Sequence, residues 1–155
     1  MSVAVVVRVE RSVNGEAEEM PDYLRTAWIE ATIEAYRSSG LFSEVRRGIS
    51  SETDLQAVVR VRDAVQGSKA FGYLSARTWL LVPSRERDRI RVRTIFRDRD
   101  GAVLGAFRSE ETVTTWFQIF LLPLAPFLSR NRVVERVIRD LSTATALRAR
   151  KRGML

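Results

Sequence analysis

The sequence predicts a single α+β domain over residues 1–155, with a mostly antiparallel sheet and two helices packed on one face of that sheet. Two observations lead to this fold class. Strand-like segments follow one another between residues 42 and 115 with short turns between them, which favours antiparallel pairing. Two segments with apolar residues at helical spacing need the apolar face of a sheet to bury their own apolar stripes. The predicted order of the elements is β-α-β-β-β-β-β-α.

The first predicted strand covers residues 3–9, because this run is mostly apolar and rich in β-branched valine. A loop over residues 14–19 follows it. The first predicted helix begins at Pro21, which the first turn of a helix tolerates, and its apolar residues continue at helical spacing as far as Tyr36. Gly40 predicts the end of this helix, because glycine readily takes the left-handed conformation found there.

The other five strands and the second helix follow from alternation and turn chemistry. The strands are expected over residues 42–47, 55–62, 74–82, 89–96 and 102–115. The clearest alternation is in residues 89–96, where arginines point to one face and mostly apolar residues to the other. The sequence DRDG at Asp98–Gly101 supplies a tight turn. The second helix is expected over about residues 131–150, with a basic C-terminal tail at about 148–155.

The composition excludes several kinds of chemistry. The chain of 155 residues contains no cysteine and no histidine. It therefore has no disulfide, no thiolate metal site, no Ser-His-Asp triad and no histidine-bearing zinc site. We expect a protein that is not an enzyme and that uses no metal and no cofactor. A hydrolase based on carboxylates alone would need a pocket with two convergent acids of raised pKa.

The positive charge belongs to the second half of the chain. The formal net charge is +7 and the isoelectric point is about 10.9. Residues 1–75 hold nine basic and eleven acidic residues, whereas residues 76–155 hold seventeen and eight. The predicted basic surface consists of Arg130, Arg132, Arg148, Arg150, Lys151 and Arg152. This end of the chain either binds anionic lipid or nucleic acid, or is solvated with its cations near a helix C-terminus.

A nearly continuous apolar run, TTWFQIFLLPLAPFLS, joins the last strand to the last helix. The thirteen residues from 116 to 128 are fewer than the ~20 that a membrane-spanning helix needs, and Pro123 and Pro126 would interrupt a helix there. The run is expected to pack as core, to lie in a membrane interface, or to dock onto a partner protein. Its candidate membrane or partner contacts are Trp116, Phe117, Phe120, Leu121, Leu124 and Phe127.

Arginines also occupy alternate positions of two predicted strands. Arg60 and Arg62 belong to one strand, and Arg89, Arg91 and Arg93 belong to another. This face either binds phosphates across the sheet surface or is a solvated face held by cross-strand ion pairs. The strands lack the exposed aromatic pattern with which a sheet stacks nucleic-acid bases.

Several motifs resemble those of a group of bacterial cell-envelope lipoproteins. In order, they are YRSSGLFSEV, DLQAVVRVRD, GYLSARTWLLVPSRERD, DRDGAVLGAFRSEE and TTWFQIFLLPLAPF, within about residues 24–150. The helix-SGLF-strand element is also similar to the N-terminal domain of TolB and to the curli-secretion lipoproteins. The resemblance implies an envelope location and transfers no catalytic residue. The sequence departs from this group in having no lipobox cysteine.

Together these observations favour a non-enzymatic binding or assembly domain of the bacterial cell envelope. We expect it to meet an envelope protein partner, a membrane surface or both, through the apolar run and the basic helix. It would face the periplasm if an export signal has been removed upstream of Val3, and would otherwise be cytoplasmic. The alternative is a cytosolic nucleic-acid-binding module that uses the Arg-rich strand and the basic tail.

Overall fold

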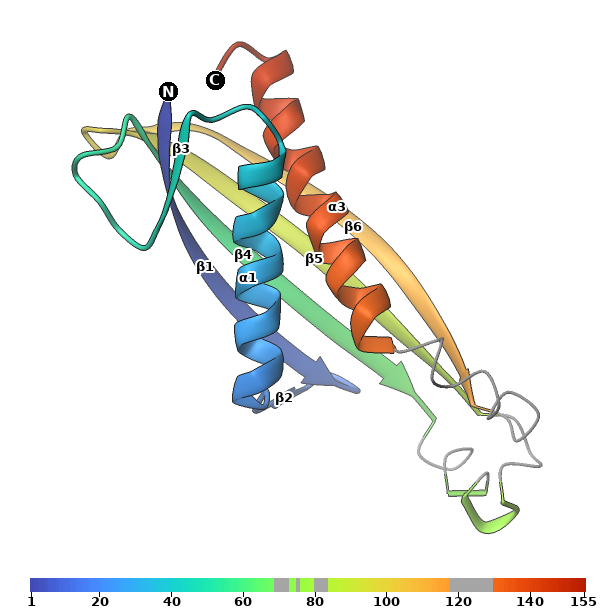
Figure 1. The fold of residues 1–155 in the computed structure, drawn as a ribbon. Helices are drawn as coiled ribbons and strands as arrows, with labels where there is room; N and C mark the ends of the chain where they lie inside the picture. Colours follow the sequence, from blue (N-terminus) through green and yellow to red (C-terminus); the bar gives the residue numbers. More distant parts are fainter. Residues whose placement is uncertain (69–72, 75, 80–83, 118–129) are drawn as a thin grey trace.

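The computed structural model describes residues 1–68, 73–74, 76–79, 84–117 and 130–155 (Figure 1). The helices are α1 (Asp22–Ser38) and α3 (Arg130–Lys151). The strands are β1 (Ser2–Val13), β2 (Glu16–Glu18), β3 (Glu44–Arg47), β4 (Leu55–Gly67), β5 (Ser84–Asp98) and β6 (Val103–Phe117). Within this part of the chain the strands form one six-stranded sheet, and both helices lie on the same face of it. The predicted α+β class is confirmed.

The sheet has the order β2-β1-β4-β5-β6, and β3 pairs with β1. Strands β4, β5 and β6 run antiparallel to one another, as predicted. Strand β1 instead pairs in parallel with both β3 and β4. A parallel pair requires a crossover connection, and α1 provides it between β1 and the strands that follow. The sheet is mostly antiparallel, and the parallel pairs of β1 are the part that the sequence did not reveal.

Alternation along the strands gives the sheet a covered face and an open face. In β4 the side chains at alternate positions from Leu55 to Val65 are buried, and all those between them are half-buried or exposed. In β5 the even-numbered residues from Asp88 to Phe96 are buried in the same way. These residues belong to the covered face, which packs against α1 and α3 (Figure 1). The other side of the sheet is called the open face below.

The boundaries of α1 agree with the helix signals in the sequence. The helix begins directly after Pro21, and Gly40 beyond its end has a φ of +66°. Tyr36 is completely buried in the last turns of the helix. The ring of Phe42 stacks on the ring of Tyr36 with 5.9 Å between the centroids. This contact directs the chain from the helix into β3.

Helix α3 packs against α1 and against strands β5 and β6. Its buried stripe includes Val134, Ile138 and Leu141, as the helical spacing predicts, and continues through Thr145 and Ala149. Together the helices and the covered face enclose one core of aliphatic and aromatic side chains. Burial of each large aliphatic side chain contributes ~1.5–3 kcal/mol, so the same core stabilises the helices and the sheet.

The prediction of a strand over residues 74–82 is wrong for those of its residues that the structure describes. Residues 73–74 and 76–77 are helical, and residues 78–79 form a turn. The backbone N–H and the hydroxyl of Thr78 both donate to the carbonyl oxygen of Leu74, which is helical bonding. A short apolar run does not distinguish a strand from a helix by its periodicity. The remaining residues of the predicted strand lie outside the described part of the chain.

The loop predicted over residues 14–19 contains strand β2. Asn14 and Gly15 have φ angles of +52° and +90°, the left-handed values that a two-residue hairpin turn requires. Strand β2 pairs with the end of β1, and Arg11 and Glu18 form an ion pair of 2.8 Å across the hairpin. The acidic composition of this segment concealed the strand, because glutamate is depleted in strands.

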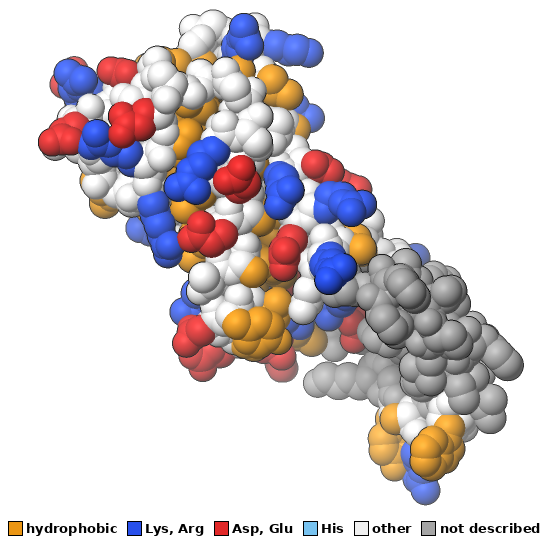
Figure 2. Space-filling model, in the orientation of Figure 1, with side chains coloured by type: hydrophobic (Ala, Val, Ile, Leu, Met, Phe, Trp, Pro, Cys, Tyr) orange, Lys and Arg blue, Asp and Glu red, His pale blue; other side chains and the backbone are white. Residues whose placement is uncertain are grey.

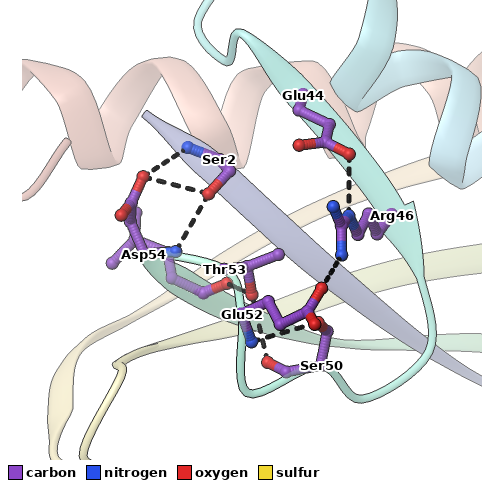
Figure 3. Close-up of polar contacts among 8 residues, drawn as sticks. Ser2, Glu44, Arg46, Ser50, Glu52, Thr53 and Asp54 are labelled. Carbon is purple, nitrogen blue, oxygen red and sulfur yellow. Dashed lines mark hydrogen bonds and ion pairs between the residues drawn. The ribbon is translucent and has the colours of Figure 1, made fainter.

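Polar contacts fix the end of the sheet at which β1 begins (Figure 3). The Asp54 carboxylate accepts hydrogen bonds from the backbone N–H and the hydroxyl of Ser2, at 2.7 and 3.0 Å. These bonds lower the pKa of Asp54 below its usual value. Arg46 forms ion pairs with Glu44 and Glu52 in the same region. The start of β1 is therefore fastened to the loop that precedes β4.

Candidate functional site

The open face carries four arginines in cross-strand register. Arg8 of β1 pairs with Arg60 of β4. Arg60 pairs in turn with Arg93 of β5, and Arg93 pairs with Arg108 of β6. Neighbouring strands lie ~4.8 Å apart, so the four side chains form a line across the sheet, called the arginine row below. Like charges directly opposite one another destabilise a sheet, so this line favours the binding of anions.

Two glutamates in the next row compensate part of this charge. Glu110 of β6 lies 2.8 Å from Arg91 and 2.7 Å from Arg108. The hydrogen bond from Arg108, followed by that from Arg91, lowers the pKa of Glu110 to about 2. At the opposite end of the same row, still on the open face, Glu10 of β1 lies 2.6 Å from Arg62. The cross-strand ion pairs expected for this face are therefore present.

The ion pairs leave the open face with excess positive charge. The arginines of its central rows are Arg8, Arg60, Arg62, Arg89, Arg91, Arg93 and Arg108, and the acids are Glu10 and Glu110. Among the residues that the structure describes, Arg8 and Arg93 take part in no ion pair. A hollow of about 180 Å³ is lined by Arg60, Arg62, Arg91, Arg93 and Arg108. Arg8 and Arg108 were not among the predicted site residues, although both lie at alternate positions of predicted strands.

The predicted basic surface on α3 includes side chains that hold the fold together. Arg130 donates to both carboxylate oxygens of Asp88 at 2.8 Å, and Asp88 is completely buried. Arg148 donates to the backbone carbonyl oxygen of Arg108 at 2.9 Å. These two arginines are therefore committed to contacts with the sheet.

The other four residues of the predicted basic surface face solvent. Arg132, Arg150 and Lys151 are exposed. Arg152 is also exposed, and its guanidinium lies over the ring of Phe107 at 5.4 Å from the centroid. Three cations of the predicted basic surface thus stay available on α3 for contacts outside the molecule.

The structure describes little of the predicted apolar contact. Phe120, Leu121, Leu124 and Phe127 lie outside the described residues. Trp116 and Phe117 end strand β6, and only their backbone is described. The hypotheses of core, membrane and partner contact for these six side chains stay predictions.

A separate group of exposed apolar side chains lies at the end of the sheet where β6 finishes. The ends of β4 and β6 both pair with the beginning of β5, so the three strands share this end. The chain between β4 and β5 carries Tyr73, Leu74 and Trp79, which are 63%, 48% and 84% exposed. Arg77 lies over the ring of Tyr73. These four residues are called the apolar tip, which projects beyond the body of the molecule (Figures 1 and 2).

Two buried acids lie on the covered face, and sequence analysis missed them. Asp63 is 2% exposed and Asp88 is completely buried. Burial, followed by the charge of Asp88, raises the pKa of Asp63 to about 6, while Arg11 and Arg130 act in the opposite direction. Asp63 continues the buried alternate positions of β4, which is the signal that would have found it. Since Arg130 occupies both oxygens of Asp88, the arrangement is a buried ion pair with an acid beside it.

The described residues contain no helix that is long and apolar enough to cross a membrane. No group of three or more acidic side chains among them is placed to hold a metal ion.

Comparisons with known proteins show a likeness in fold. No protein-family model and no curated protein matches the chain. A protein from Helicobacter pylori, described as a neuraminyllactose-binding hemagglutinin homologue, is similar with a TM-score of 0.52 and 7% identity, covering 97% of this chain and 88% of that one. Its likeness extends over almost the whole chain and concerns the fold alone.

Two weaker structural similarities are also with bacterial proteins. A minor lipoprotein from Acinetobacter baumannii gives a TM-score of 0.43 and 13% identity, covering 94% of both chains. PelC from Paraburkholderia phytofirmans, solved as a dodecamer, gives a TM-score of 0.45 and 15% identity, covering 92% of this chain and 83% of that one.

Proposed function

We propose that this protein is a non-enzymatic binding domain of the bacterial cell envelope and that its apolar tip attaches it to a membrane surface. The observation that carries the proposal is the exposure of Trp79, whose side chain is 84% exposed. Tyr73, Leu74 and Arg77 accompany it on the same short segment. Aromatic and aliphatic side chains beside a cation are the combination that settles at the headgroup level of a bilayer.

The backbone at Trp79 adds to this argument. Its φ is +52°, a left-handed value that is uncommon for a bulky residue. A strained backbone that holds a large apolar side chain in water does not help the domain to fold. A contact of the Trp79 side chain with a surface outside the molecule would account for this backbone conformation.

The ends of β6 and α3 that lie next to the apolar tip also suit contact with a membrane surface. Strand β6 finishes at the apolar end with Phe117, where the apolar run of the sequence begins. Arg132 is exposed in the first turn of α3, and a cation beside an apolar segment strengthens binding to anionic lipid. The envelope location itself draws on the motifs that resemble those of envelope lipoproteins.

Cosedimentation with vesicles of phosphatidylglycerol and phosphatidylcholine tests the proposal. We expect the protein to sediment with the vesicles and the Trp79→Asp variant to lose most of this binding. Aspartate tolerates a positive φ, so the variant should stay folded. Salt at about 0.5 M screens charges on other surfaces, so the binding that remains reports the apolar contact.

Ile49→Asp is the matched control, because Ile49 is 82% exposed and lies beside β3, away from the apolar tip. This variant should bind vesicles like the unmodified protein. Equal binding by all three proteins would reject membrane attachment through the tip. So would failure of the unmodified protein to bind vesicles at low salt, which would favour a protein partner.

A further inference from the structure

We infer that the hollow on the open face is a binding site for a small ligand that presents two neighbouring phosphate groups. The hollow measures about 180 Å³, and every side chain that lines it is an arginine. It lies over the middle of β4, β5 and β6, on the side of the sheet that the helices leave uncovered. The inference does not depend on membrane attachment, which uses the apolar tip.

The charge of the site selects a multiply charged anion. Five arginines line the hollow, and the two acids that pair with them are Glu10 and Glu110. The lining therefore keeps three positive charges that these acids do not neutralise. A phosphomonoester carries about 1.5 to 2 negative charges at neutral pH. Two such groups therefore neutralise the site, whereas a single carboxylate does not.

The geometry of the arginines suits phosphate oxygens. Arg60, Arg93 and Arg108 reach the hollow from three neighbouring strands, in register. Each guanidinium presents a planar fork of N–H donors that can bind two phosphate oxygens at once. Glu110 holds Arg108 at the edge of the hollow. Arg93, at the centre, has no ion-pair partner among the described residues, so its donors are available to a ligand.

The size and surroundings of the hollow argue against a nucleic acid. Its volume of about 180 Å³ accommodates phosphate groups and leaves the rest of a ligand outside. The row beside the arginine row consists of Val6, Val58, Ile95 and Ala106. Without an aromatic side chain in these positions, bases have no platform on which to stack.

An acidic groove lies on the side of the molecule that carries the helices. This groove between α1 and α3 is lined by Glu30, Glu34 and Glu135 together with Arg139 and two alanines. Its charge repels phosphate. A phosphorylated ligand is therefore disfavoured in this groove.

Isothermal titration calorimetry with inorganic pyrophosphate tests the site. We expect one pyrophosphate per chain, with affinity that falls as salt is added. Arg93→Gln should weaken binding by about tenfold or more, because a charge-assisted hydrogen bond is lost. Arg93 makes no ion pair in the described structure, so the variant should keep its melting temperature. Arg136→Gln removes the same charge from an exposed position on α3 and should leave the affinity within about twofold.

Several results would overturn the inference. Absence of pyrophosphate binding would do so, and equal weakening by the two variants would show attraction to net charge alone. Tight binding of a single-stranded oligonucleotide that pyrophosphate does not displace would make the face a nucleic-acid surface. Vesicle binding that depends on Arg93, without pyrophosphate binding, would make it a membrane surface. The Trp79→Asp variant should bind pyrophosphate normally, so the failure of one proposal is distinguishable from the failure of the other.

Discussion

Three buried hydroxyl groups form a hydrogen-bonded chain through the core. The hydroxyl of Tyr36 lies 3.1 Å from that of Thr94, which lies 3.0 Å from that of Thr145. Thr145 donates its single proton to the carbonyl oxygen of Ser142. Thr94 must then donate to Thr145, and Tyr36 to Thr94, since each hydroxyl has one proton. Burial raises the pKa of Tyr36 to about 12, so the phenol keeps its proton at neutral pH.

Thr94→Val tests the importance of this chain. The substitution preserves shape but leaves the Tyr36 hydroxyl buried without an acceptor, so we expect a loss of about 1–3 kcal/mol in the free energy of unfolding. Tyr36→Phe removes the stranded group itself and should restore part of that loss in the double variant. Urea denaturation gives these values. Thr112→Val, at an exposed position of β6, is the control; an equal effect at both threonines would assign the loss to strand propensity.

Asp63 predicts a pH dependence of stability with an unusual sign for an acid. Its pKa rises from 3.8 to about 6 on folding, so the folded state binds its proton more tightly than the unfolded state does. The stabilising contribution is complete below pH ~4 and is lost as the pH rises through about 6. Asp63→Asn should therefore be more stable than the unmodified protein above pH 6, by about 1–3 kcal/mol.

Thermal unfolding between pH 4 and pH 8 measures this difference. Because other carboxyls also titrate over part of this range, the quantity to follow is the difference in stability between the two proteins at each pH. It should shrink towards pH 4, where Asp63 is neutral in the folded state of the unmodified protein and about half protonated in the unfolded state. A difference that does not change with pH would contradict the raised pKa.

At the scale of elements, one ion pair fastens the start of α3 to the sheet. Arg130 donates to both oxygens of the completely buried Asp88. Arg130→Met should lower the free energy of unfolding by about 3–5 kcal/mol, because it leaves a buried charge without a partner. Adding Asp88→Asn should recover part of this loss. Arg132→Met is the exposed control, and a comparable loss there in urea denaturation would refute the specific role of the pair.

The helices were predictable because their signals are local. Proline before α1, glycine after it and the apolar stripe of α3 place both helices within one or two residues of their observed bounds. The segment at residues 73–79 was not predictable, because its apolar residues fit a helix and a strand equally well. Strand β2 depends on pairing with β1, which outweighs the poor strand propensity of its glutamates.

At the scale of the whole molecule, the arginine row shows what a sequence leaves undetermined. Alternation predicts that Arg60 and Arg93 point to the same face of their strands as their neighbouring arginines do. It does not predict that Arg8 lies opposite Arg60, because that register depends on the parallel pairing of β1 with β4 across the α1 crossover. The register of β6 brings Arg108 into the same line. The arginine row exists only once all three pairings are formed, and the hollow needs those of β4 with β5 and of β5 with β6.

The same long-range pairings predict how the molecule opens. Val59, Val61 and Val92 are completely buried at the centre of the sheet, whereas β2 and the apolar tip are largely exposed. We expect the amides of β4 and β5 to exchange hydrogen only on global unfolding, and those of β2 and residues 76–79 to exchange much faster. Hydrogen exchange followed by mass spectrometry resolves these segments.

Ile138→Val distinguishes one cooperative unit from two. Ile138 is completely buried in α3, within the core that α1 and the sheet share. The lost methyl group should reduce stability by about 1 kcal/mol, which is roughly a fivefold faster global exchange. If the domain unfolds as one unit, exchange accelerates by this factor in β4, in β5 and in α1 alike. Faster exchange confined to α3 would mean that the last helix detaches by itself and that the remaining sheet and α1 stay folded without it.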